Sequence, residues 1–248
     1  MADSARRIAD ELRARIGSGE LSPGDRLPGE PALVGEYGVA KETARRALTL
    51  LVTEGLAVRK RGSGTYVRSF RPLRRVANKR LSQAGWGNGR SIWSADVDDR
   101  ELRVADVEVA EVPAPERVSR ALALSEGDPV VVRSRRYLVD GEAVQTATSW
   151  LPAELVRGTA ITRPDTGSGG IYARLAELGL APARFAEELR ARMPSRAETE
   201  LLALPEATPV VEIHRVAFTA DDLAVELNEM LLDAGSYVLE YHLDSQSE

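Results

Sequence analysis

Residues 40–68 read AKETARRALTLLVTEGLAVRKRGSGTYVR, a stretch in which a helix pattern gives way to a hairpin pattern. Its first half repeats apolar residues at the spacing of one helix face, which predicts a helix over residues 40–54. Residues 56–59 and 65–68 are strand candidates, and the loop between them is basic and rich in glycine. In helix-turn-helix proteins the second helix of the pair enters the major groove of DNA, so this pattern predicts a recognition helix followed by a wing.

Two further helices are predicted upstream of this stretch. Apolar residues recur every four positions within residues 4–18, which predicts an amphipathic helix. A second helix is predicted over residues 30–37, and Gly38 is placed to end it. Three helices and a hairpin make a winged helix-turn-helix domain, for which we expect the bounds 1–68.

The charge of the chain is divided unevenly along its 248 residues, whose net charge is −5. Residues 1–80 hold 17 Lys/Arg and 9 Asp/Glu, a balance of +8, which leaves 16 and 29, or −13, for residues 81–248. A basic patch acts over about one Debye length, so the basic head can bind a polyanion although the whole chain is acidic. The charged residues of the head could also form an ordinary solvated surface, but their order and spacing favour DNA binding.

The composition excludes several classes of protein. The chain has no cysteine, which rules out disulfide scaffolds, thiolate metal sites and cysteine nucleophiles. No apolar run reaches the ~18 residues that a membrane-spanning helix needs, and the N-terminal residues lack the apolar core of a signal peptide. We therefore expect a cytoplasmic protein with no metal ion, no other cofactor and no contact with a membrane.

Beyond a basic linker at residues 69–80, strand and helix patterns alternate. Strands are predicted over residues 104–112, 130–139, 144–151, 210–219 and 225–232, and helices over residues 116–124, 171–178 and 197–204. A helix–turn–strand block at residues 117–131 recurs loosely at residues 196–211. The predicted fold class is therefore α+β, with an antiparallel sheet in a second domain over residues 81–248.

The N-terminal motifs resemble those of GntR-type bacterial transcription regulators. The matching motifs are Gly19-Glu20-Leu21, Pro23-Gly24-Asp25, Leu27-Pro28, Tyr37-Gly38-Val39, Glu54-Gly55-Leu56 and Gly62-Ser63-Gly64-Thr65. The resemblance covers residues 4–68 and implies that the recognition helix and the wing contact DNA. The residues expected to do so are Lys41, Thr43 and Arg45 in the helix, and Arg61, Gly62, Ser63 and Gly64 in the wing. Lys41 and Pro31 stand where this family usually has arginine, so base readout is expected to differ.

Residues 75–245 resemble the UTRA ligand-binding domain of the HutC-like branch of that family, whose fold is similar to that of chorismate lyase. The resemblance rests on motifs such as Gly127-Asp128-Pro129-Val130, Asp140-Gly141-Glu142, Ser149-Trp150-Leu151-Pro152 and Gly169-Gly170-Ile171-Tyr172. It implies a small-molecule effector, often an anionic metabolite, with Gly170, Tyr172 and Glu226 in the pocket. A serine common at position 170 is missing, and Ala147 replaces a pocket acid, which argues against a phosphosugar effector.

Arginines add to the residues expected around the effector. Arg133, Arg135 and Tyr137 alternate along one predicted strand and therefore share one face of the sheet. The two arginines either clamp a phosphate or carboxylate group, or pair with acids across the sheet or at a dimer interface. Arg80, from the basic linker, completes the expected set of effector contacts.

Together these patterns predict a homodimeric transcription regulator, expected to be a repressor, that binds a palindromic operator and responds to an effector. An architectural DNA-binding protein with an inert dimerisation domain is one alternative, and its DNA binding would not respond to small molecules. An enzyme is the other alternative, but His214 and His242 lie far apart, and Glu187 and Glu188 read as solvated charge at the approach to a helix. Trp86, in a glycine cluster, reads as a packing anchor. No catalytic residue is predicted.

Overall fold

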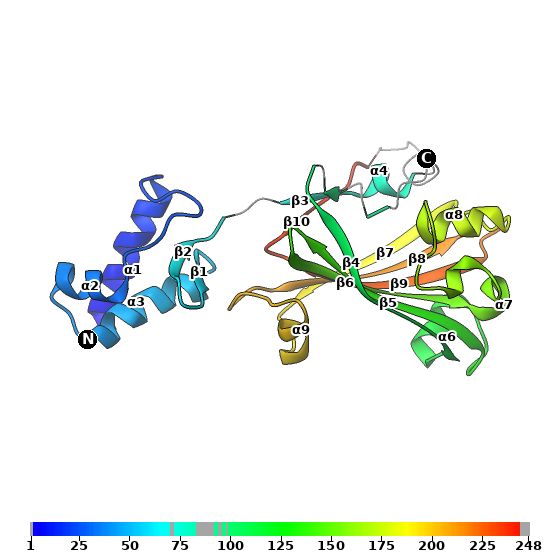
Figure 1. Cartoon of the computed structure of the whole chain (residues 1–248), viewed down its shortest axis with the longest axis horizontal. Helices are drawn as coiled ribbons and strands as arrows, with labels where there is room; N and C mark the ends of the chain where they lie inside the picture. The colour runs from blue at the N-terminus through cyan, green and yellow to red at the C-terminus, as the bar shows by residue number, and fades with distance from the viewer. Residues whose placement is uncertain (1, 70–71, 83–91, 94–95, 98, 244–248) are drawn as a thin grey trace. The chain divides into compact units, whose positions relative to one another are not determined.

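The computed structural model describes residues 2–69, 72–82, 92–93, 96–97 and 99–243 of the chain (Figure 1). These residues form two compact units. The N-terminal unit comprises residues 1–71 with residues 193–200 and 204–208, and the C-terminal unit comprises the remainder. Each unit has its own buried apolar core.

The first segment of the N-terminal unit forms three helices and a two-stranded antiparallel hairpin. Its elements are α1 (Ala2–Gly17), α2 (Glu30–Tyr37), α3 (Lys41–Thr53), β1 (Ala57–Lys60) and β2 (Gly64–Val67). Ile8 of α1, Leu33 of α2 and Leu51 of α3 are fully buried in one cluster, which holds the helices together. Gly38 ends α2 with a φ of 62°, a left-handed conformation that glycine adopts without strain and that turns the chain toward α3. The predicted helices and hairpin are confirmed.

The C-terminal unit is built on a six-stranded antiparallel sheet in the order β4-β5-β6-β9-β8-β7. Its strands are β4 (Leu102–Pro113), β5 (Pro129–Val139), β6 (Glu142–Pro152), β7 (Arg184–Arg192), β8 (Val210–Phe218) and β9 (Ala224–Asp233). The helices along the same part of the chain are α6 (Glu116–Leu122), α7 (Ala153–Val156), the 3-10 turn η2 (Ala160–Thr162), α8 (Gly170–Glu177) and α9 (Arg196–Leu201). The α+β fold class is confirmed.

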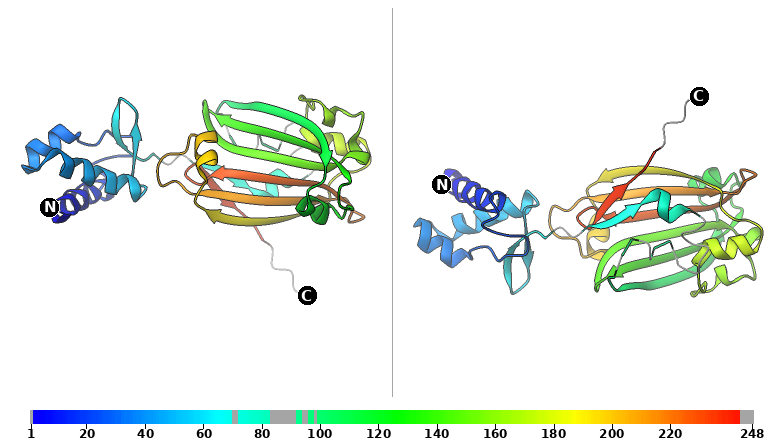
Figure 2. Two further views of the ribbon diagram at one scale, coloured as in Figure 1. Left: turned by 90° about the horizontal axis from the view of Figure 1, so that it is seen from below. Right: turned by 90° about the horizontal axis from the view of Figure 1, so that it is seen from above.

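The two faces of this sheet are covered by different elements (Figure 2). Over one face lie β3 (Leu73–Val76), α4 (Ala77–Leu81) and β10 (Tyr237–Glu240). β3 and β10 pair in parallel, so the first and the last described strands of the unit lie side by side. Helix α6 packs on the opposite face, where Val118 and Leu122 join Leu227 in a separate cluster.

One element contradicts the sequence prediction directly. Glu187 and Glu188 were expected near a helix, but they lie within strand β7, so that prediction is wrong. Residues 184–192 are rich in good helix formers, yet they pair along their whole length with β8, and this tertiary pairing overrides local propensity. As a result the Glu187 side chain is only 7% exposed. Trp86 and its glycine cluster lie outside the described residues.

The predicted helix–turn–strand repeat is confirmed. Helix α6 leads into the β5–β6 hairpin, and helix α9 leads into the β8–β9 hairpin. Both helices are followed by an alanine in the left-handed conformation, Ala123 with a φ of 53° and Ala203 with a φ of 48°. This shared turn directs each helix into the first strand of the hairpin.

Candidate nucleic-acid interface and ligand cavity

Helix α3 separates a buried face from a charged one. Ala44, Ala47, Leu48, Leu51 and Val52 are buried. Lys41 and Arg45 are exposed, and Thr43 is half-buried. The Lys41 side chain is 80% exposed, and its Nζ lies 3.9 Å from Glu30, a weak surface contact that leaves the charge open to a partner.

The hairpin between β1 and β2 is a tight, basic turn. Gly62 and Gly64 have φ values of 72° and 128°, which favour glycine. A Cβ on Gly64 would lie 2.9 Å from the Arg26 side chain, so the position is also restricted by packing. The Ser63 and Tyr66 hydroxyls are 2.6 Å apart, which braces the tip of the turn. Arg61, Gly62, Ser63 and Gly64 are all exposed.

The C-terminal unit contains a cavity of about 420 Å³. Tyr137, which lines it, packs in the same cluster as Leu73 of β3, so the cavity lies on the face of the sheet that β3 covers. Its polar and charged lining residues are Arg133, Arg135, Asp165, Thr166, Arg215, Glu226 and Asn228. Its aromatic lining residues are Trp93, Tyr137 and Tyr172, and glycines 167, 169 and 170 form part of the rim. The cavity therefore contains five of the six predicted effector residues.

Two predicted cavity arginines are held by the protein itself. Nη1 of Arg133 donates to the carbonyl oxygens of Ile161 and Arg163, and Nη2 donates to that of Pro164 at 3.0 Å. Arg135 donates to the Tyr137 hydroxyl at 2.8 Å and to the Ser149 hydroxyl at 2.9 Å. These contacts are to carbonyl and hydroxyl oxygens and not to the acids considered from the sequence. Arg133 anchors the loop around η2, and Arg135 orders the neighbouring wall of the cavity.

The other predicted residues that line the cavity are Gly170, Tyr172 and Glu226. Gly169 and Gly170 both have positive φ, and the Gly170 N–H donates to the Gly167 carbonyl at 3.3 Å, so this N–H is already used. Tyr172 is buried, and burial raises the pKa of its hydroxyl. Glu226 is 1% exposed, and its Oε2 accepts no hydrogen bond from the described residues. A ligand with a donor group could satisfy that oxygen.

Arg80 differs from the other five because it does not belong to the described cavity lining. Its guanidinium lies 4.8 Å from the centre of the Trp93 ring and 3.4 Å from the Asp96 carboxylate. Trp93 does line the cavity. Arg80 therefore supports the cavity through an aromatic side chain.

Sequence reasoning missed Arg215, which lies on β8 and is fully buried. It shares a face with Ile213 and Ala217, both buried. A charged residue at a buried position of an alternating strand was the available signal, because such charges require a specific partner. The residue opposite it on β9, Asn228, also lines the cavity and was missed.

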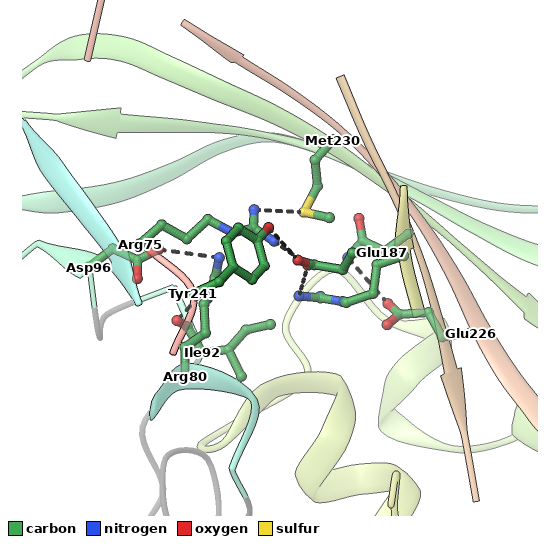
Figure 3. A network of polar contacts seen from close by, with 10 residues as sticks. Arg75, Arg80, Ile92, Asp96, Glu187, Glu226, Met230 and Tyr241 are labelled. Atoms are coloured by element: carbon green, nitrogen blue, oxygen red, sulfur yellow. Dashed lines mark hydrogen bonds and ion pairs between the residues drawn. The ribbon is translucent and has the colours of Figure 1, made fainter. Parts of the chain in front are cut away.

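A cluster of buried charges lies beside the cavity (Figure 3). The Arg75 and Glu187 side chains form an ion pair at 2.5 Å, and the Tyr241 hydroxyl donates to the other Glu187 oxygen at 2.8 Å. Nη1 of Arg75 also contacts the Met230 sulfur at 3.4 Å. Burial, together with the nearby Arg80, lowers the pKa of Arg75. This cluster attaches strand β3 to the sheet.

Replacing Arg133 with Met is expected to loosen the loop at η2. The substitution leaves the Ile161, Arg163 and Pro164 carbonyls without their donor, at a cost of about 1–3 kcal/mol in unfolding free energy. Chemical denaturation measures the loss, and amide hydrogen exchange at Ile161 should rise. In the matched control, Arg157→Met removes an exposed arginine paired with Glu111 and should cost under about 1 kcal/mol. Equal losses would show that Arg133 has no special structural role.

The two units together define a class of protein. One presents an exposed basic helix and hairpin, and the other encloses a polar, partly unsatisfied cavity. Within the described residues no group of acids and histidines could hold a metal ion. In the same part of the chain, no helix combines the length and apolar character needed to span a bilayer. These features are those of a ligand-responsive DNA-binding regulator.

Comparison with known proteins identifies the family. The model of the UTRA domain matches residues 99–237, and the model of bacterial regulatory proteins of the gntR family matches residues 4–67. An HTH-type transcriptional regulator of Streptomyces coelicolor is 36% identical over 89% of this chain and 85% of its own length. The HTH-type transcriptional repressor PhnF of Mycolicibacterium smegmatis is 28% identical over 84% of this chain and 80% of its own length. A crystal structure of a GntR-family transcriptional regulator matches with a TM-score of 0.64 and 25% identity, covering 98% of both chains.

The chain belongs to the GntR family of bacterial transcription regulators and carries a UTRA effector domain. It is a DNA-binding regulator and not an enzyme. The predicted family is thus confirmed for both halves of the chain.

Proposed function

We propose that this regulator is a homodimeric, cytoplasmic repressor of the HutC-like branch that releases a palindromic operator when an effector fills the UTRA cavity. The observation that carries the proposal is the cavity of about 420 Å³, whose wall contains buried polar atoms that lack a partner among the described residues. Relatives named repressors, such as PhnF of Mycolicibacterium smegmatis, support the sign of regulation. A two-fold dimer binds a two-fold operator, which gives the palindrome.

In this proposal the domain bounds are those expected from the sequence. Residues 1–68 bind DNA, and residues 81–248 bind the effector and form the dimer. Residues 69–80 connect the two, and strand β3 within this connection packs on the effector domain. Lys41, Thr43 and Arg45 read bases or adjacent phosphates from the N-terminal half of α3, which is the part of a recognition helix that meets base edges. The wing contacts, from Arg61, Gly62, Ser63 and Gly64, follow the neighbouring backbone.

The effector in this proposal is a small anionic molecule. Gly170, Tyr172 and Glu226 contact it directly, while Arg133 and Arg135 contribute positive potential and shape the wall. Arg80 acts through Trp93. Three lining arginines against Asp165 and Glu226 leave one excess positive charge among the described cavity residues, which favours a ligand that carries negative charge.

The proposal is tested in two stages. A thermal-shift screen of small carboxylates, phosphate esters and amino-acid catabolites should return compounds that stabilise the protein, because a ligand of the folded state raises its stability. Each hit is then added to a gel shift with the DNA upstream of the gene, where it should reduce binding. An enzyme would convert the hit, and an architectural protein would bind DNA equally with and without it, and either result would count against the proposal.

A further inference from the structure

Arg215 is the cavity arginine with the most unused donors. Its Nε, Nη1 and Nη2 atoms make no hydrogen bond of ordinary geometry among the described residues, although the side chain is fully buried and the Tyr172 hydroxyl and the Glu226 carboxylate lie close enough to interact with it. The other two cavity arginines differ, because Arg133 and Arg135 donate to backbone carbonyls and hydroxyls. A buried guanidinium without well-formed hydrogen bonds is costly, so a ligand oxyanion gains most by binding at Arg215.

Arg215 also lies close to the carboxylate of Glu187, the residue directly opposite it on β7. The Arg215 Nη1 lies 3.6 Å from Glu187 Oε1, whereas the Arg75 Nη2 lies 2.5 Å from the same oxygen. The Glu187 carboxylate therefore lies near two cations, and its closer contact is with Arg75. Tyr172 and Glu226, which line the cavity, also attract Arg215.

Arg75 connects this shared carboxylate to the chain that carries the DNA-binding unit. It lies on β3, and the C-terminal unit begins at Pro72, directly after the N-terminal unit ends at Arg71. The side chain is 1% exposed and crosses to Glu187 and Met230 on the sheet (Figure 3). The Arg75–Glu187 ion pair therefore attaches the connecting strand directly to the effector domain.

We infer that Arg215 binds an oxyanion of the effector, a carboxylate or phosphate group, and that this binding strengthens the Arg75–Glu187 pair and holds strand β3 to the sheet. The inference rests on the proposed function, since it specifies the ligand chemistry and the regulation of the same cavity. The sign follows from electrostatics. In the empty cavity Arg215 repels Arg75 and competes for Glu187, and an anion on Arg215 neutralises the repulsion and leaves Glu187 to Arg75.

The test combines anion titration with hydrogen exchange. Succinate and inorganic phosphate are the two probes, and they distinguish a carboxylate from a phosphate preference. Binding of at least one probe, measured by calorimetry on the full chain, should slow exchange of the β3 amides over residues 73–76 by about tenfold. The Leu73 N–H, which donates to the Ser236 carbonyl at 2.7 Å, is a suitable reporter.

Two substitutions should move β3 in opposite directions. Arg215→Met removes the competing cation, so it should protect β3 without any anion and should abolish binding of the probe. Glu187→Gln removes the ion pair with Arg75, so β3 should exchange fast with and without the probe. Arg75→Lys retains the charge but loses the two-nitrogen contact, and it serves as a milder version if Glu187→Gln fails to fold. Arg184→Met, on the same strand β7 and paired with Asp222 at the surface, is the matched control and should behave as the wild type.

Three results would overturn the inference. They are saturable probe binding that survives Arg215→Met, probe binding that leaves β3 exchange unchanged, and failure of both probes to bind the wild-type cavity. The proposed function fails differently, when no compound in a broad screen changes DNA binding. A compound that changes DNA binding independently of Arg215 would therefore support the proposed regulator but contradict the proposed role of Arg215.

Discussion

Arg45→Ala is expected to weaken binding to operator DNA by about 1–3 kcal/mol, the cost of losing one well-placed arginine contact to a base. Arg45 is exposed on α3, whereas Leu48 and Leu51 of the same helix are buried in the core. The substitution removes no buried contact, and alanine is a good helix former, so the fold of the unit should be unchanged. Fluorescence anisotropy with labelled upstream DNA measures the loss.

The salt dependence of binding separates the two roles open to Arg45. A phosphate contact should lower the slope of log K against log salt by about one and weaken all sequences alike. A base contact should instead reduce the preference for operator over unrelated DNA. Arg7→Ala, which removes the same charge from the exposed side of α1, is the control and should have a small effect. Unchanged affinity in Arg45→Ala would refute the assignment of α3 as the recognition helix.

Leu51→Ala is expected to destabilise the N-terminal unit by about 2–5 kcal/mol, because it removes a fully buried side chain where three helices meet. Domain stabilities are about 5–15 kcal/mol, so this loss is a large fraction of what a unit of this size has. DNA binding at physiological temperature should fall accordingly. The effector domain has a separate core and should retain its stability and its ligand binding.

Calorimetry can distinguish this local effect from general damage. The wild type should show two unfolding transitions, and only the one assigned to the N-terminal unit should shift in Leu51→Ala. Leu50→Ala, on the same helix but only partly buried, is the matched control and should shift that transition less. A shift of both transitions by equal amounts would mean that the two units unfold as one.

The repeating patterns of the chain made most of the fold predictable. Helix α3 has an apolar stripe, and β5 alternates buried and half-buried residues, so each period was visible without tertiary information. Strand β7 was not predictable in this way, because its helix-forming residues are held extended by pairing with β8. Strands β3 and β10 are four residues each and gain their structure from one another.

The site was predictable where one strand or one motif contained it. Arg133 and Arg135 lie two residues apart on β5, so their common face followed from alternation. The acceptors of the Arg133 N–H groups were not predictable, because the carbonyls of Arg163 and Pro164 belong to a loop that is distant in the sequence. Arg215 was missed for the same reason, since its neighbours Glu187 and Asn228 belong to other strands.

The pairing of β3 with β10 also constrains the order in which the molecule can be built. An ion pair between Arg74 and Glu240 spans 166 residues, so the ladder that contains both can form only after residue 240 has left the ribosome. The N-terminal unit has its helices and hairpin within residues 2–67 and can fold much earlier, at synthesis rates of about 5–20 residues per second. A nascent chain therefore forms the helices and hairpin of its N-terminal unit before β3 is attached to the effector domain.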